Sequence, residues 1–293
     1  MISGVFPPIA TPFTAQGALD AQALRANSEK WDATGLSGYV VAGSNGESAL
    51  LEDDEIVQAV GIVREAADGD RMVIAGVGRQ STQATIALAR ATAEAGSQAS
   101  LVMTPSFYGG QMTPEALKQH YWTVADSSPV PVLIYNVPKF THLNIAPATV
   151  AQIAQHDNIV GIKDSAGDIP QVIDLVRLCP EGFDILIGNG PAFMSGVQLG
   201  ASGGILAVAN VAPRECVRVL ELVRAREYEQ AREIHFRTIP IGKAVTSGFG
   251  VPGLKAALDA LGYHGGTPRP PLLPASDAVR REIRTILVDA GLL

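Results

Sequence analysis

The sequence predicts an α/β protein, a (β/α)8 TIM barrel with a C-terminal helical appendage. Eight short apolar runs alternate with segments of helical periodicity over about 225 residues, and such a barrel typically takes about 250 residues. Many runs are apolar on both faces, as in Leu101-Val102-Met103. Parallel strands covered by helices on both sides have this pattern.

The strands and helices are expected in regular alternation. The predicted strands are Gly4–Ile9, Gly38–Ala42, Met72–Val77, Ala99–Met103, Val130–Tyr135, Ile159–Lys163, Phe183–Ile187 and Gly204–Val208. The predicted helices lie near residues 20–34, 52–67, 81–95, 114–127, 147–155, 168–178, 190–199 and 213–225. Asp20, Ser81 and Thr113 precede helical patterns as N-cap residues. Gly35 and Gly96 follow helices, where a left-handed residue is expected.

A doubly wound open sheet would give the same alternation. That fold expects a glycine-rich phosphate-binding turn after its first strand, whereas the first run here ends in Pro7-Pro8-Ile9-Ala10-Thr11-Pro12. The barrel is therefore predicted to occupy residues 1–225 and to carry the active site. Residues 226–293 are predicted as helices packed on the barrel, interrupted at Gly248–Gly253 and at Gly265–Pro274.

The composition indicates a folded protein without a polyanionic partner. Of its 293 residues, 47% are hydrophobic and 17% are charged, and the net charge is −7. Scattered Lys and Arg residues give no footprint for nucleic acid or for an anionic membrane. The two cysteines, Cys179 and Cys216, lack metal-ligand spacing and suit a reducing compartment. Without a signal-peptide pattern or an apolar run of about 20 residues, a cytoplasmic location is expected.

Polar residues follow several predicted strands, at the end of the barrel where active sites of this fold lie. They include Gly43-Ser44-Asn45-Gly46-Glu47, Thr104-Pro105-Ser106-Phe107-Tyr108, Tyr135-Asn136-Val137-Pro138, Lys163-Asp164-Ser165, Gly188-Asn189-Gly190 and Ala209-Asn210. The strands thus bring an amine, phenols, hydroxyls and amides to one rim.

Lys163 is the most informative of these residues, because it alone among six lysines ends a strand-like run. Burial of an ammonium group is costly, and a neutral lysine amine attacks a carbonyl to form a Schiff base. The alternative is a structural lysine paired with Asp164 or with another buried carboxylate.

Tyr135 and the turn at Ser44 and Asn45 each have a catalytic or binding interpretation and a purely structural one. Tyr135 ends the neighbouring strand and would serve as a proton shuttle, although buried tyrosines commonly only pack and hydrogen-bond. The turn at Ser44 and Asn45 offers N–H groups and a hydroxyl to a small carboxylate, although such turns are often only turns. The five histidines are scattered, so neither a metal-dependent nor a Ser/His/Asp mechanism is predicted.

Three of these motifs, in order at the ends of strands two, five and six, resemble the dihydrodipicolinate synthase/N-acetylneuraminate lyase superfamily. They are Gly43-Ser44-Asn45-Gly46-Glu47, Tyr135-Asn136-Val137-Pro138 and Gly161-Ile162-Lys163-Asp164. Other segments are similar to the 4-hydroxy-2-oxoglutarate aldolases within it, namely Ser81–Thr85, His156–Gly161, Phe249–Lys255 and Gly262–Gly266.

The resemblance implies class I aldolase chemistry on pyruvate, without a metal or other cofactor, in a homotetramer built from two dimers. It implies that Lys163 forms the imine and that Tyr135 moves protons. It implies that Ser44 and Asn45 hold the pyruvate carboxylate and that Ser165 reaches the aldehyde end. It also implies that Gly188 and Ile205 line the substrate pocket.

The sequence departs from the family pattern at positions that bear on the substrate. Superfamily members that condense pyruvate with aspartate semialdehyde carry an arginine where this chain has Phe140, and its loss removes a bidentate carboxylate partner. Sialic-acid lyases carry acidic residues where this chain has Pro191 and Ala192. The family's relay tyrosine, contributed across a dimer interface, matches Phe107 by position, and Tyr108 is predicted to take that role.

The predicted function is therefore cleavage of a small 4-hydroxy-2-oxoacid, with 4-hydroxy-2-oxoglutarate, giving pyruvate and glyoxylate, as the first choice. A 2-keto-3-deoxy sugar-acid aldolase or a dehydratase would use the same imine. The loss of the arginine disfavours a dihydrodipicolinate synthase. A catalytically silent barrel that only binds a 2-oxoacid is the non-enzymatic alternative, supported by Phe107.

Overall fold

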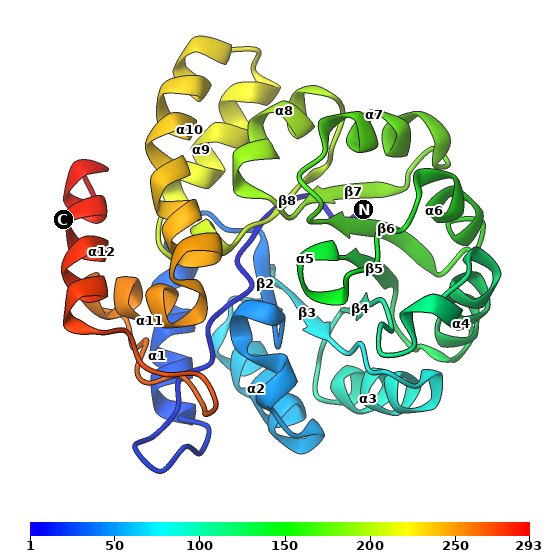
Figure 1. Cartoon of the computed structure of the whole chain (residues 1–293), viewed down its shortest axis with the longest axis horizontal. Helices are drawn as coiled ribbons and strands as arrows, with labels where there is room; N and C mark the ends of the chain where they lie inside the picture. The colour runs from blue at the N-terminus through cyan, green and yellow to red at the C-terminus, as the bar shows by residue number, and fades with distance from the viewer.

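The computed structural model describes residues 1–293 and confirms the predicted barrel (Figure 1). All the strands pair in parallel, in the order β1-β8-β7-β6-β5-β4-β3-β2. Their bounds are β1 Gly4–Phe6, β2 Gly38–Val41, β3 Met72–Gly76, β4 Ala99–Met103, β5 Val132–Asn136, β6 Ile159–Asp164, β7 Asp184–Ile187 and β8 Gly203–Ile205. Hydrogen bonds from Ile9 N to Val40 O and from Val40 N to Pro7 O, 3.0 and 2.9 Å long, close the barrel.

Helices follow the strands and surround them (Figure 1). Those of the barrel are α1 Ala21–Asp32, α2 Asp53–Ala66, α3 Thr82–Glu94, α4 Pro114–Ser127, α5 Pro138–Thr141, α6 Pro147–Ile153, α7 Ile169–Leu178, α8 Phe193–Gln198 and α9 Pro213–Arg224. The predicted caps are confirmed, since the side chains of Asp20, Ser81 and Thr113 each accept a backbone N–H of the helix that follows.

Three differences from the predicted elements have local causes. β1 ends at Phe6 because Pro7 and Pro8 lack the N–H that would continue the ladder. β8 ends at Ile205 because Ala207–Asn210 coil into a 3-10 turn, η5. Helix α5 was not predicted. It is one short turn that starts at Pro138, where the fixed φ of proline suits a first helical position.

Apolar residues pack on both faces of the strands. One buried cluster fills the barrel interior and includes Phe6, Val40, Ile74, Leu133 and Leu186. A larger cluster joins the strands to the surrounding helices. This arrangement explains the runs that are apolar on both faces, and it leaves polar side chains mainly to the strand ends.

The C-terminal helices lie beside the ring, along the left edge of Figure 1. They are α10 Tyr228–Lys243, the π-helical turn η6 Ala244–Gly248, α11 Gly250–Ala260 and α12 Asp277–Asp289. Helix α10 packs on α9, and α12 packs on α11. The domain boundary at residue 225 stays a prediction. None of the helices combines the length and the apolarity that crossing a membrane requires.

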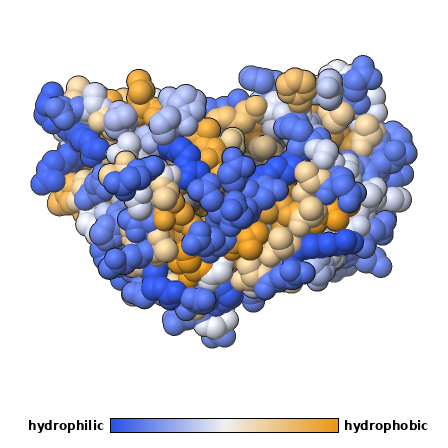
Figure 2. Space-filling view, turned by 90° about the horizontal axis from the view of Figure 1, so that it is seen from below, coloured by the Kyte–Doolittle hydropathy of each residue, from blue (hydrophilic) through white to orange (hydrophobic).

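The face seen in Figure 2 is not a continuous apolar surface, because patches of hydrophobic residues are interrupted by hydrophilic ones. This face is the one turned toward the lower edge of Figure 1, where α2 and α3 lie.

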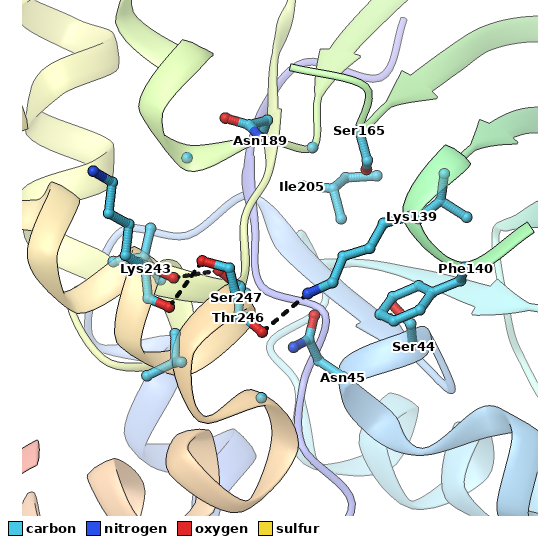
Figure 3. Close-up of a pocket in the computed structure, with 18 of the residues that line it drawn as sticks. Ser44, Asn45, Lys139, Phe140, Ser165, Asn189, Ile205, Lys243, Thr246 and Ser247 are labelled. Carbon is cyan, nitrogen blue, oxygen red and sulfur yellow. Dashed lines mark hydrogen bonds between the residues drawn. The ribbon is translucent and has the colours of Figure 1, made fainter. Parts of the chain in front are cut away.

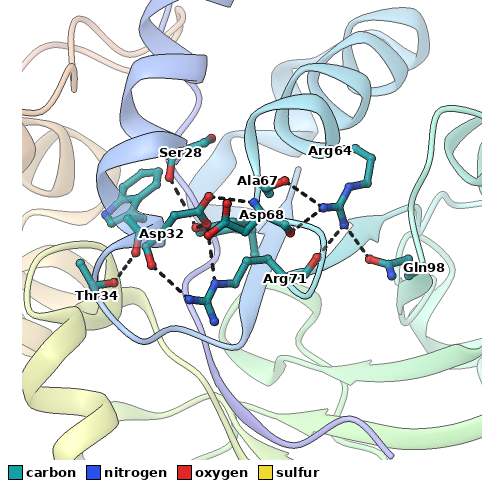
Figure 4. A network of polar contacts seen from close by, with 10 residues as sticks. Ser28, Asp32, Thr34, Arg64, Ala67, Asp68, Arg71 and Gln98 are labelled. Atoms are coloured by element: carbon teal, nitrogen blue, oxygen red, sulfur yellow. Dashed lines mark hydrogen bonds and ion pairs between the residues drawn. The ribbon is translucent and has the colours of Figure 1, made fainter.

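A polar network fixes the connection between α2 and β3 (Figure 4). The guanidinium of Arg64 donates to the carbonyls of Ala67, Asp68 and Arg71, at 3.1, 2.8 and 2.6 Å, and to Gln98 Oε1 at 3.0 Å. Asp32 accepts the N–H of Asp68 at 2.9 Å. One arginine thus donates to three carbonyls of the turn, of which Asp68 O also accepts the backbone N–H of Arg71 at 2.9 Å.

Replacing Arg64 with methionine is expected to lower the free energy of unfolding by at least about 2 kcal/mol, because several carbonyls lose their donor at once. The midpoint of urea unfolding measures the effect. Arg25→Met is the control, since Arg25 forms only an exposed ion pair with Glu65 and its loss should cost less than about 1 kcal/mol. Equal shifts for the two variants would contradict the role given to Arg64.

Candidate active site

A pocket of about 270 Å³ opens at the carboxyl ends of the strands (Figure 3). The predicted site residues that line it are Ser44, Asn45, Tyr135, Lys163, Ser165, Gly188 and Ile205. The barrel therefore brings together side chains that are far apart in the sequence. Tyr108 is the one predicted site residue that does not line this pocket.

Lys163 and Tyr135 form the buried centre of the pocket. They are paired in register on β6 and β5, with relative exposures of 2% and 5%. Lys163 Nζ lies 4.0 Å from the centroid of the Tyr135 ring. The Tyr135 hydroxyl in turn lies 3.1 Å from Ser44 Oγ. An amine, a phenol and a hydroxyl thus lie close enough to pass protons around a bound carbonyl.

The structure does not pair Lys163 with Asp164, which was the structural alternative for this lysine. Side chains alternate along β6, and the Asp164 carboxylate accepts from Asn136 Nδ2 at 2.6 Å and from Gln171 Nε2 at 2.9 Å. Desolvation raises the pKa of Asp164, and these two hydrogen bonds act in the opposite direction. None of the ion pairs in the structure includes Lys163.

Ser44 and Asn45 begin a 3-10 turn, η1, that follows β2 and ends at Gly46. The first N–H groups of such a turn have no partner within it, so they are available to an anion. The close approach of η1 to the β1 segment requires a glycine at position 46, because a Cβ there would lie 2.8 Å from the Ile9 carbonyl oxygen. Thr11 Oγ1 donates to the Gly46 carbonyl at 2.7 Å.

Ser165 and Gly188 meet on the opposite side of the pocket, at the ends of β6 and β7. A Cβ at Gly188 would lie 2.0 Å from Ser165 Oγ, so only glycine leaves room for this hydroxyl. Ile205 is fully buried at the end of β8 and supplies an apolar surface below them.

Tyr108 and its neighbour Phe107 lie on the outside of the molecule. Their relative exposures are 70% and 77%, and the two rings pack edge to face with centroids 5.0 Å apart. A relay through Tyr108 would need this loop to meet the pocket of a second copy, so that role stays a prediction.

One wall of the pocket, which comes from the C-terminal helices, was not predicted from the sequence. Gly242, Lys243, Val245, Thr246, Ser247, Gly250 and Val251 all line it. The glycine-rich break after α10 was the available signal, since a π-helical turn inside a helix frequently marks a functional site.

Lys139, on the unpredicted helix α5, reaches across the mouth of the pocket toward that wall (Figure 3). Its Nζ donates to the Thr246 carbonyl at 3.1 Å and lies 5.4 Å from the centroid of the Phe140 ring. Lys139, Lys163 and Lys243 line the pocket, and no Asp or Glu does. The Lys243 amine is directed away from the other labelled residues (Figure 3). The charge of the lining therefore favours anionic ligands. The structure gathers no group of three or more His, Cys, Asp or Glu side chains that could hold a metal ion.

A (β/α)8 barrel with a buried lysine and tyrosine at its carboxyl end is suited to the chemistry of a carbon–carbon lyase that acts through an imine. The chain belongs to the dihydrodipicolinate synthetase family, whose model matches residues 1–290. A 4-hydroxy-tetrahydrodipicolinate synthase of Methanothrix thermoacetophila is 37% identical, with 98% of this chain and 96% of the relative covered.

Solved structures agree over the whole chain. A dihydrodipicolinate synthase from Acinetobacter baumannii, complexed with pyruvate, has a TM-score of 0.95 and 29% identity, with 100% of both chains covered. A prophage protein of the same family from E. coli K12, also in complex with pyruvate, has a TM-score of 0.94 and 26% identity over 100% of both chains. The predicted superfamily is thus confirmed, whereas the curated relatives bear the synthase name and the aldolase subgroup stays a prediction.

Substituting Gly46 with alanine is expected to raise KM for the 2-oxoacid by about tenfold or more, because η1 must shift away from the Ile9 carbonyl. Steady-state kinetics measure this change. Gly61→Ala is the control, since nothing lies within 4 Å of a Cβ there and alanine in a helix should stabilise by about 0.5–1 kcal/mol. An unchanged KM in the Gly46 variant would show that the position of η1 does not matter for binding.

Proposed function

We propose that this protein is a class I aldolase that cleaves 4-hydroxy-2-oxoglutarate into pyruvate and glyoxylate through an imine on Lys163. The observation that carries the imine with an anionic 2-oxoacid is the charge of the pocket. It holds a buried lysine without a carboxylate partner and two further lysines, and no acidic residue lines it. A small dianion complements such a lining.

In the proposed reaction the neutral amine of Lys163 attacks C2 of the 2-oxoacid, and loss of water leaves a protonated imine. A base removes the proton of the C4 hydroxyl, the C3–C4 bond breaks, and glyoxylate forms. The bonding electrons pass into the imine and give an enamine. Protonation at C3 followed by hydrolysis releases pyruvate and restores Lys163. The imine cation is the electron sink for this step.

The neighbouring side chains would divide the proton transfers and the binding between them. The Tyr135 phenol would move protons during imine formation and cleavage, in contact with the Ser44 hydroxyl. Ser44 and Asn45 would hold the pyruvate carboxylate through the N–H groups of η1. Ser165 would contact the C4 hydroxyl or the aldehyde oxygen, and Tyr108 would complete the relay from a second copy in a homotetramer.

Different observations support the two halves of the proposed substrate, the pyruvate half and the aldehyde half. The two similar structures bound to pyruvate support pyruvate as the common part of the substrate. The aldehyde end rests on Phe140, which stands where condensing members have an arginine, and on Pro191 and Ala192, which supply no polar side chains for sugar hydroxyls.

Condensation of pyruvate with aspartate semialdehyde is the second candidate, because the curated relatives are named for the synthase. That aldehyde also carries a carboxylate, so the pocket charge suits both. A panel of 4-hydroxy-2-oxoglutarate, 2-keto-3-deoxygluconate and pyruvate with aspartate semialdehyde separates the candidates by kcat/KM. Preference for either of the latter two would displace the first choice, and pyruvate binding without turnover of any would favour the silent barrel.

Borohydride reduction in the presence of pyruvate should add one pyruvate-derived group per chain, at Lys163, because reduction fixes the imine as a stable amine. Mass spectrometry of the intact chain and of its peptides measures the label. Lys163→Ala should abolish both labelling and turnover, whereas Lys118→Ala, on α4 and outside the pocket lining, should change neither. An unlabelled wild-type chain would reject the imine mechanism.

Lys139, at the mouth of the pocket, is the proposed partner of the far carboxylate of 4-hydroxy-2-oxoglutarate. Lys139→Met is therefore expected to raise KM for this substrate by about tenfold, because a charge-assisted hydrogen bond worth about 1.5–3 kcal/mol before solvent screening is lost. Labelling by pyruvate, which lacks that carboxylate, should stay unchanged. Lys118→Met serves as the control for charge. If labelling and KM changed in parallel, Lys139 would be acting on the whole pocket and not on the far carboxylate.

A further inference from the structure

A buried ion pair lies directly behind the turn that is proposed to bind the carboxylate. Glu47 follows η1, and its carboxylate Oε1 lies 2.7 Å from Lys255 Nζ on α11. The two side chains are 0% and 1% exposed. Neither residue lines the pocket, and the mechanism proposed above uses neither of them.

The C-terminal segment supplies every partner of this carboxylate. The backbone N–H of Arg269 donates to Glu47 Oε2 at 2.8 Å. Lys255 Nζ also donates to the Thr267 carbonyl at 3.1 Å and lies 4.4 Å from the centroid of the Phe13 ring. Both charges are removed from water, so removal of one partner leaves the other buried and uncompensated.

The backbone of Glu47 is also linked to η1. Its N–H donates to the Ser44 carbonyl at 3.3 Å, and its φ of +61° lies in the left-handed region. A non-glycine residue adopts this conformation at a cost, so surrounding contacts must hold it there. The ion pair and the Arg269 N–H are such contacts.

We propose that Glu47 and Lys255 are positioning residues that hold η1 in the orientation in which Ser44 and Asn45 bind the carboxylate of the 2-oxoacid. This inference rests on the proposed function, because it takes η1 to be the carboxylate site. The C-terminal helices then contribute to substrate binding twice, once through the pocket wall at Thr246 and once through the support of η1.

The test is the pyruvate concentration that gives half-maximal borohydride labelling of Lys163, measured together with the melting temperature. In Glu47→Gln this concentration should rise by about tenfold to a hundredfold, because a small displacement of a binding group has effects of that size. The extent of labelling at saturating pyruvate should stay at the wild-type value, since Lys163 and Tyr135 are unchanged.

A double variant covers the case in which Glu47→Gln alone does not fold. Glu47→Gln combined with Lys255→Met removes both buried charges, so it should recover thermal stability relative to Lys255→Met alone. Weak pyruvate binding should nevertheless persist in it. Recovery of wild-type binding together with stability would show that the pair only stabilises the fold, and would overturn the proposal.

Asp184→Asn is the matched control, because Asp184 is another buried carboxylate that accepts hydrogen bonds from Ser202 Oγ and from the Ile2 N–H, at the start of β7. It should lower the melting temperature and leave pyruvate binding unchanged. If the wild-type chain is labelled and Glu47→Gln binds pyruvate as tightly as the wild type does, only the positioning role is overturned. Absence of labelling in the wild type would overturn the proposed function and this inference together.

Discussion

The burial of an amine without a counter-ion is the constraint on which this pocket depends. Two lysines are buried in the molecule, Lys163 and Lys255. The barrel pairs Lys255 with Glu47 and leaves Lys163 beside an aromatic ring and open pocket. Because no carboxylate engages the Lys163 amine, it is free to meet a carbonyl, whereas an ion pair would occupy it. The fold must therefore keep carboxylates out of reach of one lysine while supplying one to the other.

Strand alternation is the means by which the barrel keeps the nearest carboxylate away from Lys163. Successive side chains of β6 point to opposite faces, so Asp164 is directed toward the helices while Lys163 points into the barrel. There Asn136, the residue after Tyr135, donates to it. The same two strand ends thus present the amine and phenol inward and a hydrogen-bonded carboxylate–amide pair outward. Reaction chemistry and structural support occupy opposite faces of the same backbone.

The sequence predicted the parts of this molecule that depend on local patterns. Strand periodicity located β4 to the residue, and the motif residues at Ser44, Tyr135 and Lys163 proved to line one pocket. The wall formed by α10, η6 and α11 escaped prediction, because helical periodicity shows that a segment is amphipathic and not which surface it covers. The Glu47–Lys255 pair was not predicted either, because its two residues are distant in sequence and no spacing rule connects them. The identity of the aldehyde half depends on single side chains such as Phe140, which periodicity does not interpret.

The late position of Lys255 and Arg269 in the chain has a consequence for biosynthesis. A ribosome releases the N-terminal part first, so every strand of the barrel has been made before α11 exists. The partners of the Glu47 carboxylate are all present only after translation has passed Arg269. The support proposed for η1 is therefore among the last contacts of the site that a nascent chain can make.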